Sequence, residues 1–255
     1  VCCLQRWIRK AYSAKKPEVN GMKVLVINGS PKGERSNTMW LTHAFVDGFP
    51  DTAEVKYITL REKDIHPCMG CFSCWTKTPG QCAVKDDMQE IYQDILEADI
   101  IIESFPLYFA GMPSRMRMMT ERCLLFTKRY EGSPEDTFHS ILEMEEHSLK
   151  DKKLVVISSC GYVSMDTMFE GLLKEYDLIC GEGNFTSILC AQGELLQAGS
   201  RTRQVVNYLE EVKQAGQEYY ANGQISEERS QSLMKQMVSP RTFEVLIKRY
   251  WQERM

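Results

Sequence analysis

The hydrophobic and polar residues of this chain follow two periods in turn. Short runs of β-branched and other apolar residues predict buried strands at 23–28, 54–60, 99–104, 153–159 and 185–190. Apolar residues at helical spacing predict helices at 38–48, 86–98, 113–130, 165–180 and 200–221. Because strands alternate with helices, we expect an α/β fold, a doubly wound five-stranded parallel sheet with helices on both faces.

Three segments lie outside this pattern. Residues 130–153 are polar and poorly periodic, which predicts an insertion or a mobile loop. The C-terminal tail contains two helical segments divided at Ser239-Pro240, and the second carries an apolar stripe. We favour packing of this stripe on its own domain over docking to a partner. The predicted organisation is an N-terminal extension at 1–21, a sheet domain at 22–221 and a helical tail at 222–255.

Composition and charge narrow the function classes. The chain has 255 residues, 43% of them hydrophobic, which suffices for one good-sized core. With a net charge of -4 and no basic stripe, we expect no nucleic-acid partner. The chain also lacks a run approaching the ~18 apolar residues that span a membrane. We interpret the basic N-terminal segment as a dispensable extension and expect a cytoplasmic protein. For its ten cysteines, a disulfide scaffold is then the weaker explanation.

The first predicted strand runs into a small polar loop and then a helix. Gly29 and Pro31 end the strand, and Ser36, Asn37 and Thr38 offer N-cap side chains. Such a junction points backbone N–H groups and the positive end of a helix dipole into one concavity, which suits an anion. An ordinary capped turn between strand and helix is the alternative.

Side-chain chemistry suggests which anion this loop binds. Hydroxyl donors come from Ser30, Ser36 and Thr38, and Lys32 and Arg35 add positive charge. The loop lacks both G-x-x-x-x-G-K-[ST] and G-x-G-x-x-G, so neither a nucleoside triphosphate nor a dinucleotide is indicated. A terminal monophosphate, as in FMN, is the ligand that fits.

Two further strand ends carry aromatic residues. The segment 104–113 contains a turn-forming proline followed by Tyr108 and Phe109, and the segment 158–162 ends in Tyr162. Ligands of doubly wound sheets bind at the carboxyl ends of the strands. Aromatic residues near strand ends are often core residues, but three loops at the right strand ends together favour a flavin site.

Four motifs resemble the NADPH-dependent FMN reductase family of flavodoxin-like proteins. They are I-N-G-S-P-K-G-E-R-S-N-T (27–38), D-D-M (86–88), A-D-I-I-I (98–102) and P-L-Y-F-A-G-M-P (106–113). The resemblance covers residues 22–221 and implies a flavodoxin-like fold with bound FMN. It implies phosphate contacts from Ser30, Lys32, Ser36, Asn37 and Thr38. It implies ring and ribityl contacts from Pro106, Leu107, Tyr108, Phe109, Ser159, Cys160, Gly161 and Tyr162.

The resemblance also implies an activity. NAD(P)H would pass hydride to the flavin, which would then reduce a flavin, a quinone or a similar small-molecule acceptor. The cofactor supplies this chemistry, so no catalytic residue is assigned. A homodimer or homotetramer is expected, because a second subunit often completes the acceptor pocket in this family. The methionines near 112–119 suit an adaptable interface, although they could equally be core.

The cysteine loop requires a separate interpretation. Its spacing is C-x2-C-x2-C-x7-C, formed by Cys68, Cys71, Cys74 and Cys82. Four thiolates on one loop suit a soft metal or a cluster. The spacing resembles that of the iron–sulfur flavoproteins, a branch of the same family, which implies a [4Fe–4S] cluster on these cysteines. Zinc, or an empty loop anchored by Trp75, are the alternatives.

The cysteine loop therefore leaves three functions open. The first is an FMN-dependent NAD(P)H oxidoreductase. The second is an electron-transfer protein with FMN and a [4Fe–4S] cluster, taking electrons from a ferredoxin-like donor. The third is a non-enzymatic scaffold with a structural metal site. The three strand-end loops favour the first two.

Overall fold

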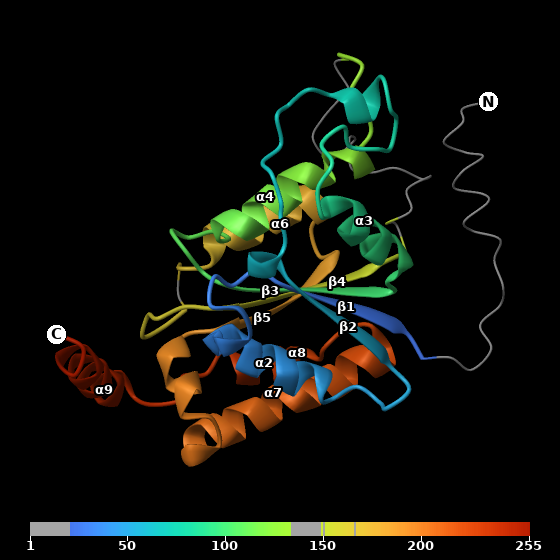
Figure 1. Ribbon diagram of the computed structural model, residues 1–255. Coiled ribbons are helices and arrows are strands. Elements are labelled where there is room, and N and C mark those ends of the chain that lie inside the picture. Colours follow the sequence, from blue (N-terminus) through green and yellow to red (C-terminus); the bar gives the residue numbers. More distant parts are fainter. Residues whose placement is uncertain (1–20, 134–148, 150, 166) are drawn as a thin grey trace.

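The computed structural model describes residues 21–133, 149, 151–165 and 167–255, apart from the side chain of Ser200. Within these residues, five parallel strands form one sheet in the order β2-β1-β3-β4-β5 (Figure 1). The strands are β1 Lys23–Asn28, β2 Glu54–Thr59, β3 Ile100–Pro106, β4 Lys153–Ser159 and β5 Phe185–Cys190. The predicted doubly wound sheet is confirmed, because the strand order reverses at β1.

Helices cover both faces of this sheet. They are α2 Asn37–Val46, α3 Met88–Glu97, α4 Ser114–Arg122, α6 Glu170–Cys180, α7 Arg203–Asn222, α8 Glu227–Leu233 and α9 Pro240–Gln252. Figure 1 shows α3, α4 and α6 on one face, and α2, α7 and α8 on the other. In the described residues, no helix is long and apolar enough to cross a bilayer.

The core forms two clusters, one on each side of the sheet. Along β1, Val24 and Val26 face the α2 and α7 side, whereas Leu25 and Ile27 face the α3 and α4 side. All four side chains are almost completely buried. Because both faces of the strand are covered, its sequence is a continuous apolar run without alternation.

Helices α2 and α7 pack with backbone contact. A Cβ added to Gly216 of α7 would lie 1.9 Å from the carbonyl oxygen of Phe45 in α2. Only glycine fits at this position, because the side chain of any other residue would push the two helices apart. The close approach fixes α2, and therefore the loop that precedes it.

The helix predicted at 113–130 is too long. Helix α4 ends eight residues earlier than expected, and a 3-10 turn, Cys123–Phe126, follows it. The indole Nε1 of Trp75 donates to the carbonyl oxygens of Leu124 (3.2 Å) and Thr127 (3.1 Å). A continuing helix would need these carbonyls for its own hydrogen bonds, so the cysteine loop's anchor also ends the helix.

Two other predicted boundaries also need correction. The strand predicted at 99–104 extends through Pro106, which pairs with Ser159 of β4. The helix predicted at 165–180 begins only at Glu170, because the preceding residues form tighter turns, such as the 2.8 Å bond from the Met168 N–H to the Met165 carbonyl. The remaining strand and helix predictions agree with the structure to within a few residues.

The methionines of 112–119 belong mainly to the core. Met112, Met116 and Met119 are buried, and Met118 is partly buried. The prediction that they form an adaptable interface is therefore wrong, because they pack into the core cluster on the α3 and α4 side of the sheet.

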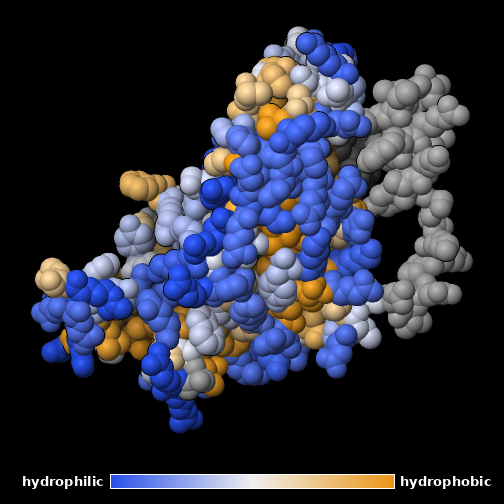
Figure 2. Space-filling model, viewed as in Figure 1, coloured by the Kyte–Doolittle hydropathy of each residue, from blue (hydrophilic) through white to orange (hydrophobic). Residues whose placement is uncertain are grey.

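The tail is divided at Ser239-Pro240, as predicted. Ser239 caps α9 by accepting from the Thr242 N–H at 3.2 Å. Of the apolar stripe, Phe243 is buried, whereas Leu246 and Trp251 are exposed. The preferred interpretation, packing on its own domain, therefore holds for Phe243 and in part for the half-buried Ile247 and Tyr250. Helix α9 extends away from the sheet, and Figure 2 shows apolar side chains along it.

Gln192, just after β5, links the tail to the sheet domain. Its side chain is fully buried. Its amide nitrogen donates to the carbonyls of Val238 (2.9 Å) and Val163 (3.3 Å), and its amide oxygen accepts from the Val238 N–H at 3.0 Å. One side chain thus connects the tail with the loop after β4. Most of the predicted insertion at 130–153 and of the extension at 1–21 lies outside the described residues.

Candidate functional site

The carboxyl ends of β1, β3 and β4 lie side by side at one edge of the sheet, because these strands are neighbours. The Gly29 N–H donates to the Ser104 carbonyl at 2.8 Å, and the Leu107 N–H donates to the Ser159 carbonyl at 2.9 Å. The hydroxyls of Thr38 and Ser159 are 2.7 Å apart. The structure therefore brings together the three loops that the sequence predicts to form the flavin site.

The loop after β1 is held by its own hydroxyl side chains. Ser30 Oγ accepts from the Lys32 N–H at 3.2 Å, and Ser36 Oγ accepts from the Thr38 N–H at 3.2 Å as the N-cap of α2. Both serines are buried. Since each oxygen accepts from the backbone, each hydroxyl hydrogen is left to donate to an anion. Lys32 is exposed beside them, and Asn37 opens the helix.

The loop after β3 presents its aromatic side chains to solvent. Tyr108 and Gly111 close a two-residue turn, in which Phe109 (φ 48°) and Ala110 (φ 58°) are both left-handed. Phe109 is completely exposed, and Tyr108 is 45% exposed. The core interpretation of these residues is excluded, and their faces are free to contact a flat ligand. Pro106 and Leu107, at the end of β3, are partly buried beneath them.

The loop after β4 is tied to β5. The Cys160 N–H donates to the Cys190 carbonyl at 2.9 Å, and the Cys160 carbonyl accepts from the Gly193 N–H at 2.8 Å. Burial raises the pKa of the Cys160 thiol. Gly161 and Tyr162 are exposed, and a Cβ on Gly161 would meet the Glu194 carboxylate at 2.7 Å. The exposed part of this loop therefore faces the same edge of the sheet as the β1 and β3 loops.

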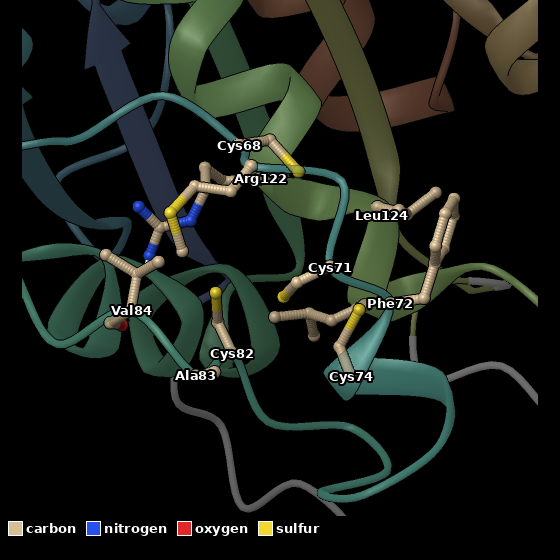
Figure 3. Close-up of a pocket in the computed structure, with 11 residues that line it drawn as sticks. Cys68, Cys71, Phe72, Cys74, Cys82, Ala83, Val84, Arg122 and Leu124 are labelled. Atoms are coloured by element: carbon tan, nitrogen blue, oxygen red, sulfur yellow. Dashed lines mark hydrogen bonds between the residues drawn. The ribbon is translucent and has the colours of Figure 1, made fainter.

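A second site lies among the four cysteines of the predicted loop. Figure 3 shows their side chains around one hollow, with the sulfurs of Cys71, Cys74 and Cys82 pointing into it and Cys68 above. All four are free thiols. The other walls are mainly apolar and come from Met69, Phe72, Ala83, Val84, Arg122, Leu124 and Leu125. The four cysteines that the sequence predicts as ligands therefore line one hollow.

The donor set fits a cluster better than a single ion. In the part of the chain that is described, no three His, Cys, Asp or Glu side chains are placed to hold one metal ion. Zinc needs its thiolates around one point, whereas the irons of a cluster take one thiolate each. Burial raises the pKa of the Cys74 thiol, and the negative charge of Cys82 raises it further. A bound cation would offset that repulsion.

Beneath the cysteine loop lies an ion pair that the sequence analysis missed. The side chains of Arg122 and Asp86 are both completely buried, with Nη1–Oδ2 and Nη2–Oδ1 distances of 2.6 and 3.0 Å. Burial alone would raise the pKa of Asp86, but hydrogen bonds from Arg122 and two backbone N–H groups lower it. Burial alone would lower the pKa of Arg122, but Asp86, Tyr92 and Cys82 raise it. His66 is an exposed loop residue beside this pair.

Sequence reasoning also missed a carboxyl inside the sheet domain. Glu103 lies on β3 among apolar neighbours, and the Tyr176 hydroxyl donates to it. Burial raises the pKa of Glu103 to about 7, and nearby Glu175 raises it as well. Arg117 is paired with Glu175 instead. The signal in the sequence was a single acid inside an apolar run.

Comparison with known proteins identifies the family of this chain. A family described by its flavodoxin-like fold matches residues 22–179. The chain belongs to this flavodoxin-like family. The match confirms the family that the motifs at 27–38 and 106–113 indicated.

Individual flavodoxin-like proteins are similar over part or most of the chain. An iron-sulfur flavoprotein of Methanocaldococcus jannaschii is 37% identical over 101 residues, covering 40% of this chain and 51% of that protein. The chain spans about half the length of the curated relatives it matches. The structure of an NAD(P)H:quinone oxidoreductase from Methanothermobacter marburgensis aligns with a TM-score of 0.53 at 16% identity, covering 78% of this chain and 96% of that one. The structure of an FMN-dependent NADH-azoreductase from Bacillus anthracis, in complex with FMN, aligns with a TM-score of 0.52 at 14% identity, covering 78% of this chain and 99% of that one. At these identities, the two structures show the fold alone.

Proposed function

We propose that this protein is an FMN-dependent NAD(P)H oxidoreductase that reduces a flavin, a quinone or a similar small molecule. The observation that carries the proposal is the convergence of the three loops at the carboxyl ends of β1, β3 and β4, joined by the 2.7 Å contact between the Thr38 and Ser159 hydroxyls. The neighbouring structures named as FMN-dependent azoreductase and quinone oxidoreductase support it.

Each loop has a role in binding FMN. Ser30, Ser36 and Thr38 would donate hydroxyl hydrogen bonds to the phosphate, with Asn37 at the helix N-terminus and Lys32 as a nearby charge. The flavin ring and ribityl chain would lie along two segments, Pro106–Leu107–Tyr108–Phe109 and Ser159–Cys160–Gly161–Tyr162. When bound, FMN supplies the hydride chemistry, and the exposed aromatic faces orient the ring and exclude water.

The second candidate function is an electron-transfer protein with FMN and a [4Fe–4S] cluster. It is favoured by the hollow lined by Cys68, Cys71, Cys74 and Cys82 and by the relatives named iron-sulfur flavoproteins. These four thiolates would hold the cluster, and a ferredoxin-like protein would be the electron donor. The free thiols of the loop also support a reducing, cytoplasmic location.

FMN binding tests the first function. The Ser36→Glu variant places a carboxylate against the proposed phosphate, so we expect at least a tenfold loss of FMN affinity in a flavin-fluorescence titration. Ser239→Glu is the matched control, because Ser239 also caps a helix but lies in the tail. A protein that binds no FMN, or a Ser36→Glu variant that binds it like the control, would refute this placement.

Metal content tests the second function. Protein purified without oxygen should contain iron and sulfide in addition to FMN, and Cys71→Ser should lose the iron while keeping FMN. Cys180→Ser is the control, since this thiol lies far along the chain on α6. A protein with a full complement of flavin but neither iron nor zinc would exclude both metal sites and leave the FMN-dependent oxidoreductase as the function.

We also propose that the protein forms a homodimer or homotetramer, with a second subunit beside the flavin. The completely exposed Phe109 and the exposed stripe on α9 support this, because isolated chains rarely expose such apolar side chains in groups. A monomer by light scattering at micromolar concentration would contradict it.

A further inference from the structure

The wall of the cysteine hollow carries one positive charge. Arg122 lines this hollow, and its side chain is completely buried. Figure 3 shows Arg122 beside the hollow, between Cys68 and Val84. A cation in a mostly apolar wall is costly unless charge partners surround it. Asp86 supplies one such partner.

The guanidinium joins both ends of the cysteine loop. Its Nη1 donates to the carbonyl of His66 at 2.8 Å, two residues before Cys68. Its Nη2 donates to the carbonyl of Val84 at 3.4 Å, two residues after Cys82. Asp86 completes the link by accepting from the His66 N–H at 3.0 Å. One side chain on α4 therefore sets the separation of the first and last cysteines.

One donor of Arg122 is left over. Its Nε is buried and has no hydrogen-bond partner among the described residues. Leaving such a donor unsatisfied is unfavourable, and more so when it belongs to a charged group. Arg122 and Cys82 line the same hollow. The unused N–H and the charge therefore both match an anionic sulfur ligand in the hollow.

We propose that Arg122 positions the four-cysteine site and balances its charge: its fork holds the ends of the loop, and its Nε–H donates to a sulfur of a cluster bound there. This inference rests on the iron–sulfur function proposed above. The reduced form of a cluster is more negative than the oxidised form, so a nearby cation and an N–H···S bond both favour reduction.

Two substitutions at one position separate these contributions. Arg122→Lys keeps the charge but loses Nε and the fork, whereas Arg122→Gln also loses the charge. Arg117→Lys and Arg117→Gln are matched controls, because Arg117 lies on the same helix and pairs with Glu175. The readouts, on anaerobically purified protein with FMN retained, are iron and sulfide per chain, the rate of iron loss to a chelator, and the cluster's midpoint potential.

For Arg122→Gln we expect at least a tenfold shift of the reduction equilibrium toward the oxidised form, about 59 mV more negative for a one-electron couple. For Arg122→Lys we expect a smaller shift in the same direction and at least tenfold faster iron loss. Should the Gln variant fail to fold, the Lys variant decides by the same readouts.

Two outcomes would overturn the proposal in distinguishable ways. If the unmodified protein carries a cluster and both Arg122 variants match the Arg117 controls in potential and iron loss, Arg122 is structural only. If the unmodified protein holds FMN but neither iron nor sulfide, the cluster itself is refuted, and this role of Arg122 with it.

Discussion

Replacing Glu103 with glutamine tests whether the carboxyl inside the sheet domain governs stability against pH. The pKa of Glu103 is raised from 4.5 to about 7 in the folded protein, chiefly by burial. Between these two values the folded protein keeps a proton that the unfolded chain has released. Rising pH therefore favours unfolding across this interval.

The size of the change in unfolding free energy follows from the pKa shift of Glu103. A difference of roughly 2.5 pKa units at about 1.4 kcal/mol each amounts to about 3 kcal/mol of stability lost between pH 4.5 and 7.5. Glu103→Gln keeps an oxygen that accepts from the Tyr176 hydroxyl but carries no charge. Its stability relative to the unmodified protein should therefore rise by about 3 kcal/mol over this range and then level off.

Urea unfolding at half-unit pH steps from 4.5 to 8 measures this difference. The control is Glu97→Gln, which removes an exposed acid paired with Lys23 and should show no such trend. A difference between the Glu103→Gln variant and the unmodified protein that stays constant with pH, or that falls as pH rises, would refute the reasoning.

Three further predictions concern packing and exposure. Gly216→Ala should lower the free energy of unfolding by about 2 kcal/mol or more, since its Cβ would meet the Phe45 carbonyl at 1.9 Å; an unchanged urea midpoint would contradict this. Trp75→Phe keeps an aromatic ring but loses both indole hydrogen bonds, so hydrogen exchange should speed up in the cysteine loop and at 124–127, and equal protection would disprove the anchoring role. Phe109→Ser should change the unfolding free energy of the isolated chain by less than ~0.5 kcal/mol, because the side chain is completely exposed in the single chain; a larger loss in urea, at a concentration where the protein is monomeric, would mean that Phe109 supports the fold.

The sheet was predictable because its strands are buried on both faces. Continuous apolar runs identify such strands, and the bounds of β4 and β5 agree with the predicted ranges residue for residue. The loop after β1 and the Ser36 cap of α2 were predictable as well, since the capping residues stand next to one another in the sequence. These signals are local, so one sequence suffices to detect them.

The features that escaped prediction depend on distant residues. Arg122 and Asp86 are 36 positions apart in the sequence. An arginine on an amphipathic helix ordinarily lies on the face exposed to solvent, so nothing in the sequence indicates that this one is buried. The end of α4 is set by Trp75, whose indole reaches carbonyls 49 and 52 positions away. The methionines near 112–119 were misjudged because helical spacing shows which residues share a face, but not what covers that face.

Gln192 couples the C-terminal tail to the loop after β4. Its backbone N–H donates to the Tyr162 carbonyl at 2.8 Å, while its side chain binds Val163 and Val238. The residues that would contact the ring and the residues before α9 therefore share one buried amide. A fragment cut at the end of the sheet domain would leave that amide without its partners at Val238. A ligand that displaces Tyr162 would in turn shift Val238 through Gln192, so the position of α9 would depend on whether the proposed flavin site is occupied.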